Sequence, residues 1–118
     1  MDVRELERKI ELGRLLDFYG PLLTEHRQAL LRMYCEDDLS LAEIAQALSE
    51  AGQKITRQGV YDAVTKSEKQ LTEFEDKLGL IRRYDDLRRE ADRCLAALSA
   101  GGAGLEAAKS ALRRMTEL

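Results

Sequence analysis

The sequence is poor in residues that break helices and in residues that build catalytic or metal sites. It has one Pro, no Trp, two Phe, four Tyr and a single His among 118 residues. Two cysteines without CxxC or Cys/His spacing indicate neither a zinc site nor a disulfide framework. No Ser or Cys has a plausible base beside it in the sequence. We therefore expect a protein that is not an enzyme and uses no cofactor.

Long apolar runs are also missing. No stretch approaches the roughly 18 apolar residues that a membrane span needs, and the N-terminal segment MDVRELERKIELGR lacks the apolar core of a signal peptide. We expect a cytoplasmic protein without membrane contact. Cys35 and Cys94 are then expected to be small buried hydrophobic residues in a reducing compartment.

Charged residues and strong helix formers dominate the composition of the sequence. Charged residues make up 35% of the chain and hydrophobic residues 44%, a balance typical of an all-helical protein. Nineteen Lys and Arg against 22 Asp and Glu give a formal net charge of −3. This balance argues against a protein that coats nucleic acid through overall charge, so any basic surface must be local.

Local signals predict four helices in the first part of the chain. The first covers residues 3–19 and ends at Gly20 and Pro21, and Thr24 caps the second. The first has six residues on its apolar face: Leu6, Ile10, Leu12, Leu15, Leu16 and Tyr19. The second buries Leu30, Leu31 and Tyr34.

The next two helices have equally clear starts. Ser40 and Glu43 form a capping box for the third helix, and Thr56 is the best cap for the fourth. The third lines one face with Leu41, Ile44, Ala45 and Leu48. The fourth has apolar residues in heptad register if polar Ser67 counts as one member: Val60, Val64, Leu71, Phe74 and Leu78. Gly79 interrupts or ends it, which places a first helical domain at residues 1–79.

A second heptad series follows over residues 80–99. Its members are Leu80, Tyr84, Leu87, Ala91, Cys94 and Leu98. This seam either joins two copies in a homodimer or packs against the chain's own helices. Residues 100–118 are expected to contain a flexible break, AGGAG, and a short tail helix with an apolar stripe poor in large side chains. The stripe comprises Leu105, Ala108, Leu112 and Met115.

Residues 40–69 have the pattern of a helix-turn-helix, in which the second helix enters the major groove. Arg57 and Gln58 fall on the first turn of that helix, where Arg can pair with guanine and Gln with adenine. Six residues would contact nucleic acid: Lys54, Arg57, Gln58, Tyr61, Lys66 and Lys69. The alternative is that the charged members are ordinary solvated side chains and that Tyr61 lies near the core. Asp62 would repel phosphate and weighs against duplex binding.

Three segments of the sequence resemble those of a known family. The segments FYGPLLTEHRQALLRMYCEDD, DDLSLAEIAQAL and TRQGVYDAVTKSEKQLTEFEDKLGL are similar to those of the YlxM-like family of small bacterial helix-turn-helix proteins. That family in turn resembles region four of primary sigma factors. The resemblance implies an all-α fold of the DNA-binding helix-turn-helix class, with five or six helices including a C-terminal extension. It also implies a regulatory role linked to the signal recognition particle pathway, because the family's genes tend to lie beside those for its targeting GTPases.

Two departures from the family pattern lie within the helix-turn-helix pattern of residues 40–69. The segment SEAGQKIT lengthens a short turn by about five residues, a change that closure entropy tolerates. Gly59 stands where the family has Ala, although Gly within a helix costs ~1 kcal/mol. Close approach of another backbone or of a phosphate would explain this Gly, and so would drift at a site no longer used.

The sequence thus supports two hypotheses. The first is a regulator that binds DNA or structured RNA, such as the RNA of the signal recognition particle. The second is a protein-interaction adaptor of the targeting machinery that kept the fold but lost duplex reading. Net acidity, Asp62 and the enlarged turn favour the second, and the local basic residues favour the first.

Overall fold

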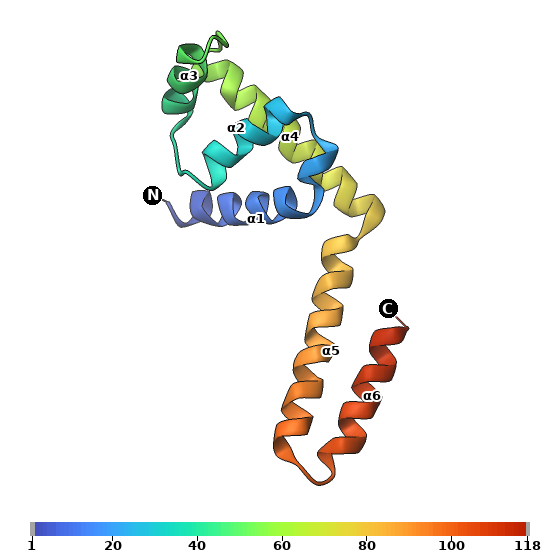
Figure 1. The fold of residues 1–118 in the computed structure, drawn as a ribbon. Helices are drawn as coiled ribbons and strands as arrows, with labels where there is room; N and C mark the ends of the chain where they lie inside the picture. Colours follow the sequence, from blue (N-terminus) through green and yellow to red (C-terminus); the bar gives the residue numbers. More distant parts are fainter. Residues whose placement is uncertain (1, 118) are drawn as a thin grey trace. The chain divides into compact units, whose positions relative to one another are not determined.

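A computed structural model describes residues 2–117, and α-helices dominate it (Figure 1). No β-strand occurs among these described residues, which confirms the predicted all-α class. The elements in chain order are α1 (Val3–Tyr19), the short 3-10 helix η1 (Gly20–Leu22), α2 (Glu25–Cys35), α3 (Leu41–Glu50), α4 (Arg57–Leu78), α5 (Leu80–Ala100) and α6 (Gly104–Thr116). None of the helices within residues 2–117 combines the length and apolar character needed to cross a membrane.

The chain divides into two compact units, and the boundary along the sequence lies between Leu78 and Gly79. We call them the N-terminal unit, which contains α1 to α4, and the C-terminal hairpin, which contains α5 and α6. Gly79 has φ 62°, in the left-handed region that Gly adopts without steric cost. This residue ends α4 as the sequence predicts, and a new helix begins directly after it.

The helix starts in the N-terminal unit agree closely with the sequence prediction, because caps are local interactions. The Thr24 side chain accepts a hydrogen bond from the Arg27 amide at 3.3 Å. Ser40 and Glu43 form the expected reciprocal capping box, with distances of 3.0 and 3.1 Å. The Thr56 hydroxyl accepts from the Gly59 amide at 3.0 Å. Each bond satisfies an amide that lacks a partner within its own helix.

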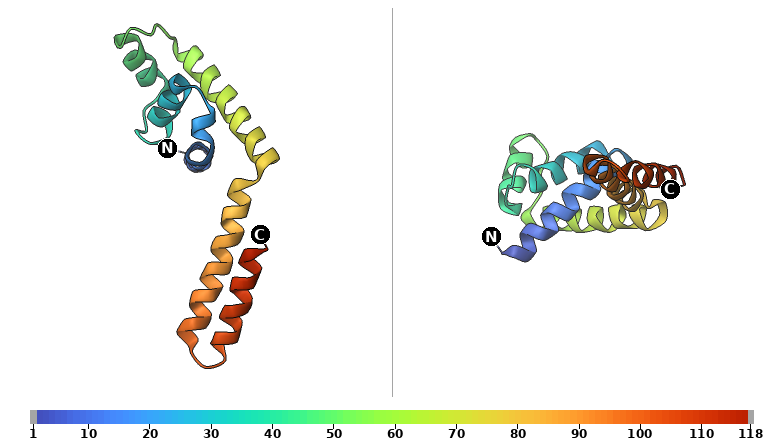
Figure 2. Two further views of the ribbon diagram at one scale, coloured as in Figure 1. Left: turned by 45° about the vertical axis from the view of Figure 1, so that its right-hand side comes forward. Right: turned by 90° about the horizontal axis from the view of Figure 1, so that it is seen from below.

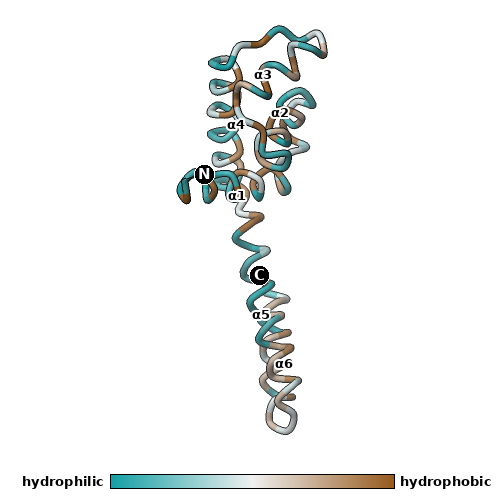
Figure 3. The backbone as a smooth tube through the Cα atoms, turned by 90° about the vertical axis from the view of Figure 1, so that its left-hand side faces the viewer, coloured by the Kyte–Doolittle hydropathy of each residue, from teal (hydrophilic) through white to brown (hydrophobic). Residues whose placement is uncertain are grey.

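The core of the N-terminal unit lies among its four α-helices. Figure 3 shows hydrophobic and hydrophilic positions alternating along the turns of α4, as expected of an amphipathic helix. The predicted heptad face of α4 is buried at Val60, Val64 and Leu71, and Ser67 is fully buried on the same face. Its last predicted member, Leu78, is 56% exposed. The largest fully buried side chains on the other helices are Leu12, Leu16, Tyr19, Leu30, Leu31 and Ile44.

The N-terminal half of α1 differs from the sequence prediction. Leu6 and Ile10 are exposed, at 47% and 64%, while Lys9 is only 7% exposed. The Lys9 Nζ lies 2.8 Å from Asp38 Oδ1 and 4.6 Å from the centre of the Tyr34 ring. The aliphatic stem of Lys9 can therefore cover apolar surface while its charge stays paired. Burial alone would lower the pKa of Lys9, but the hydrogen bond to Asp38 raises it.

The C-terminal hairpin is formed by two antiparallel helices that lie side by side (Figure 2). Its tight turn contains Gly101 and Gly102, with φ 68° and 52°. A Cβ at Gly104 would lie 1.9 Å from the carbonyl oxygen of Ala97, so the two backbones approach too closely for any side chain there. Small residues fill the contact between the helices: Cys94, Ala97, Ala108 and Ala111.

This packing bears on two sequence predictions for the hairpin. Cys94, expected to be a small buried residue, is buried in the small-residue core between α5 and α6, and the dimer seam to which it was assigned stays a prediction. The other members of the predicted seam are at least partly exposed. On α6, Ala108 is buried as predicted, but Leu105 and Leu112 are exposed and Ala111 is buried instead. Alanine faces α5 because only small side chains fit where the backbones are this close.

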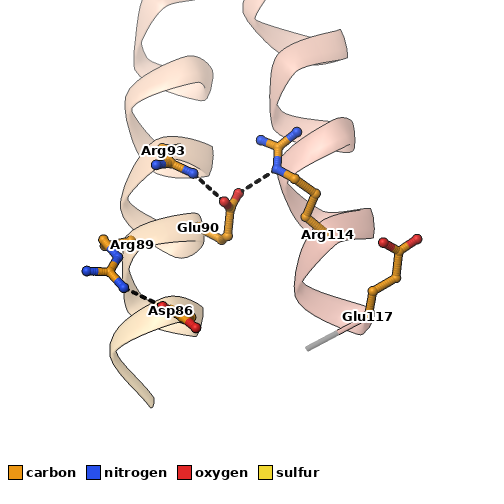
Figure 4. Close-up of a pocket in the computed structure, with 6 residues that line it drawn as sticks. All are labelled: Asp86, Arg89, Glu90, Arg93, Arg114 and Glu117. Atoms are coloured by element: carbon orange, nitrogen blue, oxygen red, sulfur yellow. Dashed lines mark hydrogen bonds and ion pairs between the residues drawn. The ribbon is translucent and has the colours of Figure 1, made fainter. Parts of the chain in front are cut away.

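Charged residues line one side of the hairpin (Figure 4). Glu90 is buried and forms ion pairs with Arg93 on its own helix and with Arg114 on α6, the latter at 2.9 Å. Asp86 and Arg89 form a further ion pair on α5. The pair between Glu90 and Arg114 therefore links the two helices, while the pair with Arg93 stays within α5.

Candidate nucleic-acid interface

The helix-turn-helix candidate consists of α3, the connection over residues 51–56 and α4. The start of α4 lies beside α3 in Figures 1 and 2. The long connection is closed by local bonds: the Gln53 amide donates to the Leu48 carbonyl at 2.8 Å, and the Ser49 hydroxyl donates to the Ile55 carbonyl at 3.4 Å. Gly52 supplies a φ of 94° at the tip. The inserted residues thus form an ordered cap at the end of α3.

The same connection explains Gly59. A Cβ at this position would lie 2.9 Å from Cγ1 of Ile55 and 3.3 Å from the Thr56 hydroxyl. Ile55 is half-buried and packs against the first turn of α4. The close neighbour of Gly59 is therefore a side chain of the enlarged turn itself, so the Gly follows from the way this turn packs.

All six residues predicted to contact nucleic acid have exposed side chains. The cations Lys54, Arg57, Lys66 and Lys69 form no ion pair within the described part of the chain. Several other cations of the N-terminal unit are paired. Arg8 lies 2.7 Å from Glu68, where the hydrogen bond raises the pKa of Arg8, and Arg32 lies 2.9 Å from Glu36.

The six residues do not form a single face. Successive residues turn by about 100° around a helix, so Arg57 and Lys66 point to opposite sides of α4. Gln58 and Lys69 share the side that faces away from the core, and Tyr61 lies on the flank nearer Arg57. Four of the six are neighbours along the chain at the beginning of the helix: Lys54, Arg57, Gln58 and Tyr61. Lys66 and Lys69 lie further along α4, and each extends the basic surface on a different side of the helix.

Asp62 affects this site more directly than its charge alone suggests. The Gln58 side-chain amide donates to the Asp62 carboxylate at 3.1 Å, so the residue best suited to read adenine already has a partner. The spacing of four residues on a helix could have indicated this contact from the sequence. Base reading by Gln58 therefore requires exchange of Asp62 for a base edge.

Sequence reasoning missed the contacts that hold α4 in place. The Tyr19 hydroxyl donates to Glu75, and the Arg27 guanidinium donates to the Gln70 side chain at 3.2 Å. These partners lie far apart in the sequence, as do Arg8 and Glu68, and no local spacing reveals them. Together they tie α1 and α2 to α4 and orient the helix that carries the candidate site.

Cys35, expected to be buried, is only half-buried, on α2. Burial raises the pKa of its thiol to about 11. A thiol that remains protonated at neutral pH is a poor nucleophile.

Comparison with known proteins places this geometry in a family. Residues 6–97, which include the whole candidate interface, match the model of the UPF0122 family, described as "Putative helix-turn-helix protein, YlxM / p13 like". The chain belongs to this family. The resemblance stated from the sequence is thereby confirmed, and so is the helix-turn-helix class of the fold.

Several family members are similar over most of the chain. A UPF0122 protein of Thermoanaerobacter sp. (strain X514) is 42% identical over 79 residues, 67% of this chain and 63% of the relative. One from Clostridium botulinum is 38% identical over 72% of both chains. One from Desulforamulus reducens is 36% identical over 91% of this chain and 92% of the relative. The matched segment thus spans less than two thirds of the Thermoanaerobacter protein. No solved structure matches the chain.

Proposed function

We propose that this family member is a non-enzymatic regulator that binds double-stranded DNA through the start of α4. The observation that carries the proposal is the group of four exposed cations, Lys54, Arg57, Lys66 and Lys69, that have no ion-pair partner within residues 2–117. An acidic protein that leaves these charges unpaired on a helix-turn-helix has local attraction for a polyanion despite its net charge.

The proposed contacts follow from the position of each side chain. Arg57 and Gln58 lie on the first turn and would face base edges in the major groove. Lys54 precedes the helix and would contact phosphate on one side of the groove. Lys66 and Lys69 lie further along α4 and would contact the backbone, and the Tyr61 hydroxyl would donate to a phosphate.

Structured RNA is the second polyanion to consider, because of the proposed link to the signal recognition particle. The major groove of an RNA duplex is too deep and narrow for side chains on a helix to read. The helix-turn-helix therefore favours DNA, and the RNA of the particle is the necessary comparison ligand.

The test is a salt series with matched variants. If the three lysines each neutralise one phosphate, a tenfold rise in salt should weaken binding by about 500-fold, because log K falls by about 0.9 per neutralised phosphate. R57E/K66E should bind more weakly and with a shallower salt slope. K77E makes the same type of charge change on α4 but about 30 Å from Arg57, so its binding should equal that of the unaltered protein.

Binding is to be measured by fluorescence anisotropy with promoter DNA upstream of the chain's own gene and with particle RNA. Absence of binding to DNA at low salt would reject the proposal. Equal losses of DNA affinity in R57E/K66E and K77E would also reject it, because they would show non-specific electrostatic attraction instead of a defined binding site.

The adaptor function is the second candidate, and one observation favours it. Val3, Leu6 and Ile10 form an exposed apolar stripe on α1, on the side opposite the buried residues of that helix. Such a stripe suits a protein partner, and the proposed partner is a targeting GTPase of the signal recognition particle pathway. The L6K/I10K variant should lose binding to the purified GTPase while R57E/K66E retains it. The reverse pattern would exclude the adaptor function.

A further inference from the structure

The C-terminal hairpin carries six of the twelve exposed large hydrophobic residues among the described residues, and it carries them on one side. We call this side the leucine face, and its exposed members are Leu80, Tyr84, Leu95, Leu98, Leu105 and Leu112. Half-buried Leu87, Ala91 and Met115 lie between them. Tyr84, Leu87 and Ala91 of α5 line one groove together with Met115 of α6, so both helices contribute to the same surface.

Helix geometry explains why the two apolar stripes coincide. On each helix the exposed leucines lie about a quarter turn from the side that contacts the other helix. Because α5 and α6 are antiparallel, both quarter turns point to the same side of the hairpin. The opposite side contains the ion pairs of Glu90, Asp86 and their arginines (Figure 4). The hairpin as a whole is therefore amphipathic.

The core of the hairpin buries too little apolar area to stabilise the hairpin without a contribution from the leucine face. Its core consists of one cysteine and a few alanines, whose burial removes little apolar area from water. Units of about 40 residues or fewer usually need a further source of stability, such as oligomerisation. Two amphipathic helices with one apolar side have the form of half a four-helix bundle.

We infer that the leucine face binds the leucine face of a second copy of this chain, forming an antiparallel four-helix bundle. The charges at its edge select this partner. Arg88 and Asp92 border the groove, and neither forms an ion pair within residues 2–117, where Arg88 donates only to the Tyr84 hydroxyl at 3.4 Å. A two-fold axis near Ala91 places Arg88 of each copy beside Asp92 of the other.

This self-complementarity is the property that an isologous interface requires, since each residue must find its partner on an identical surface. A basic or an acidic partner would satisfy only one of the two charges. The inferred interface differs from the seam predicted from sequence, because Cys94 is taken up inside each hairpin and residues of α6 join the contact. It does not depend on the proposed binding of DNA.

The experiment is sedimentation of the full chain, without nucleic acid, over a roughly hundredfold range of concentration. The unaltered chain should be a dimer. L98K/L112K changes two residues that are each 51% exposed, so the monomer should keep its helicity by circular dichroism. Dimerisation should weaken more than about 1,000-fold, since each buried leucine contributes a factor of roughly 10 to 100. I10K/L22K is the matched control, because these residues are equally apolar and exposed but lie in the N-terminal unit.

Charge reversal tests the two-fold arrangement and needs no change in apolar residues. R88D should weaken the dimer by roughly tenfold, because it places two acidic residues together, and R88D/D92R should restore it. A monomeric unaltered chain would overturn the inference and leave the leucine face to another protein or to the rest of the chain. A dimeric L98K/L112K, a monomeric I10K/L22K, or a double reversal no tighter than R88D would each overturn it as well.

Discussion

Ser67 offers the sharpest test of the core of the N-terminal unit. It lies on the heptad face of α4 between Val64 and Leu71, is fully buried, and its hydroxyl has no hydrogen-bond partner among the described residues. A buried hydroxyl without a partner costs ~1–3 kcal/mol relative to its hydrated state. The substitution Ser67→Ala removes this cost and leaves the backbone unchanged.

The expected gain is the sum of two terms. Removal of the unpaired hydroxyl contributes the larger one, and the better helix propensity of Ala adds up to ~0.5 kcal/mol. Loss of the packing contacts of one oxygen atom offsets part of the gain. We expect Ser67→Ala to raise the free energy of unfolding by about 1–2 kcal/mol. For a unit of this size, that corresponds to a rise of roughly 4–15 °C in melting temperature.

The assay is scanning calorimetry combined with urea unfolding followed by circular dichroism. Thr72→Ala is the matched control, because Thr72 is exposed on the same helix and carries only the propensity term. Its expected effect is about 0.5 kcal/mol or less. If Ser67→Ala is no more stable than Thr72→Ala, or is destabilised, the hydroxyl is not an energetic burden and the reasoning is wrong.

Three further predictions concern single positions. Gly59→Ala should destabilise the protein by about 1 kcal/mol in urea unfolding despite better helix propensity, because the new methyl group meets Ile55 at 2.9 Å, and adding Ile55→Ala should reverse the sign of the effect. Gly104→Ala should undock α6, since its Cβ would lie 1.9 Å from a carbonyl oxygen; hydrogen exchange on α6 should accelerate while that on α2 stays the same. In a variant lacking the other cysteine, Cys35, with a pKa of about 11, should react with iodoacetamide at pH 8 about a hundredfold more slowly than a thiol with the ordinary pKa of 9.0. The reaction rate should rise with pH up to about 11. A rate that stops rising near pH 9 would contradict the raised pKa.

The sequence also indicated much of the candidate site, for a simple reason. Charged residues near a capped helix start are almost always exposed, and all six predicted contact residues are exposed. The angular distribution of the five that lie on α4 follows from helix periodicity alone. The Gln58–Asp62 bond follows the same four-residue spacing. What periodicity could not supply is the set of contacts that orients α4, because Arg8 and Glu68 are 60 positions apart.

The sequence by itself determined where helices begin and end. Caps such as those of Thr24, Ser40 and Thr56 act within three residues, so their effect does not depend on the rest of the fold. The tertiary structure alone decided which side of a helix is buried when several sides are acceptable. Lys9 is inside and Ile10 outside because Asp38, distant in sequence, supplies a partner for the charge. The leucines of α6 likewise lie outside because the close approach of α5 admits only alanine between the two helices.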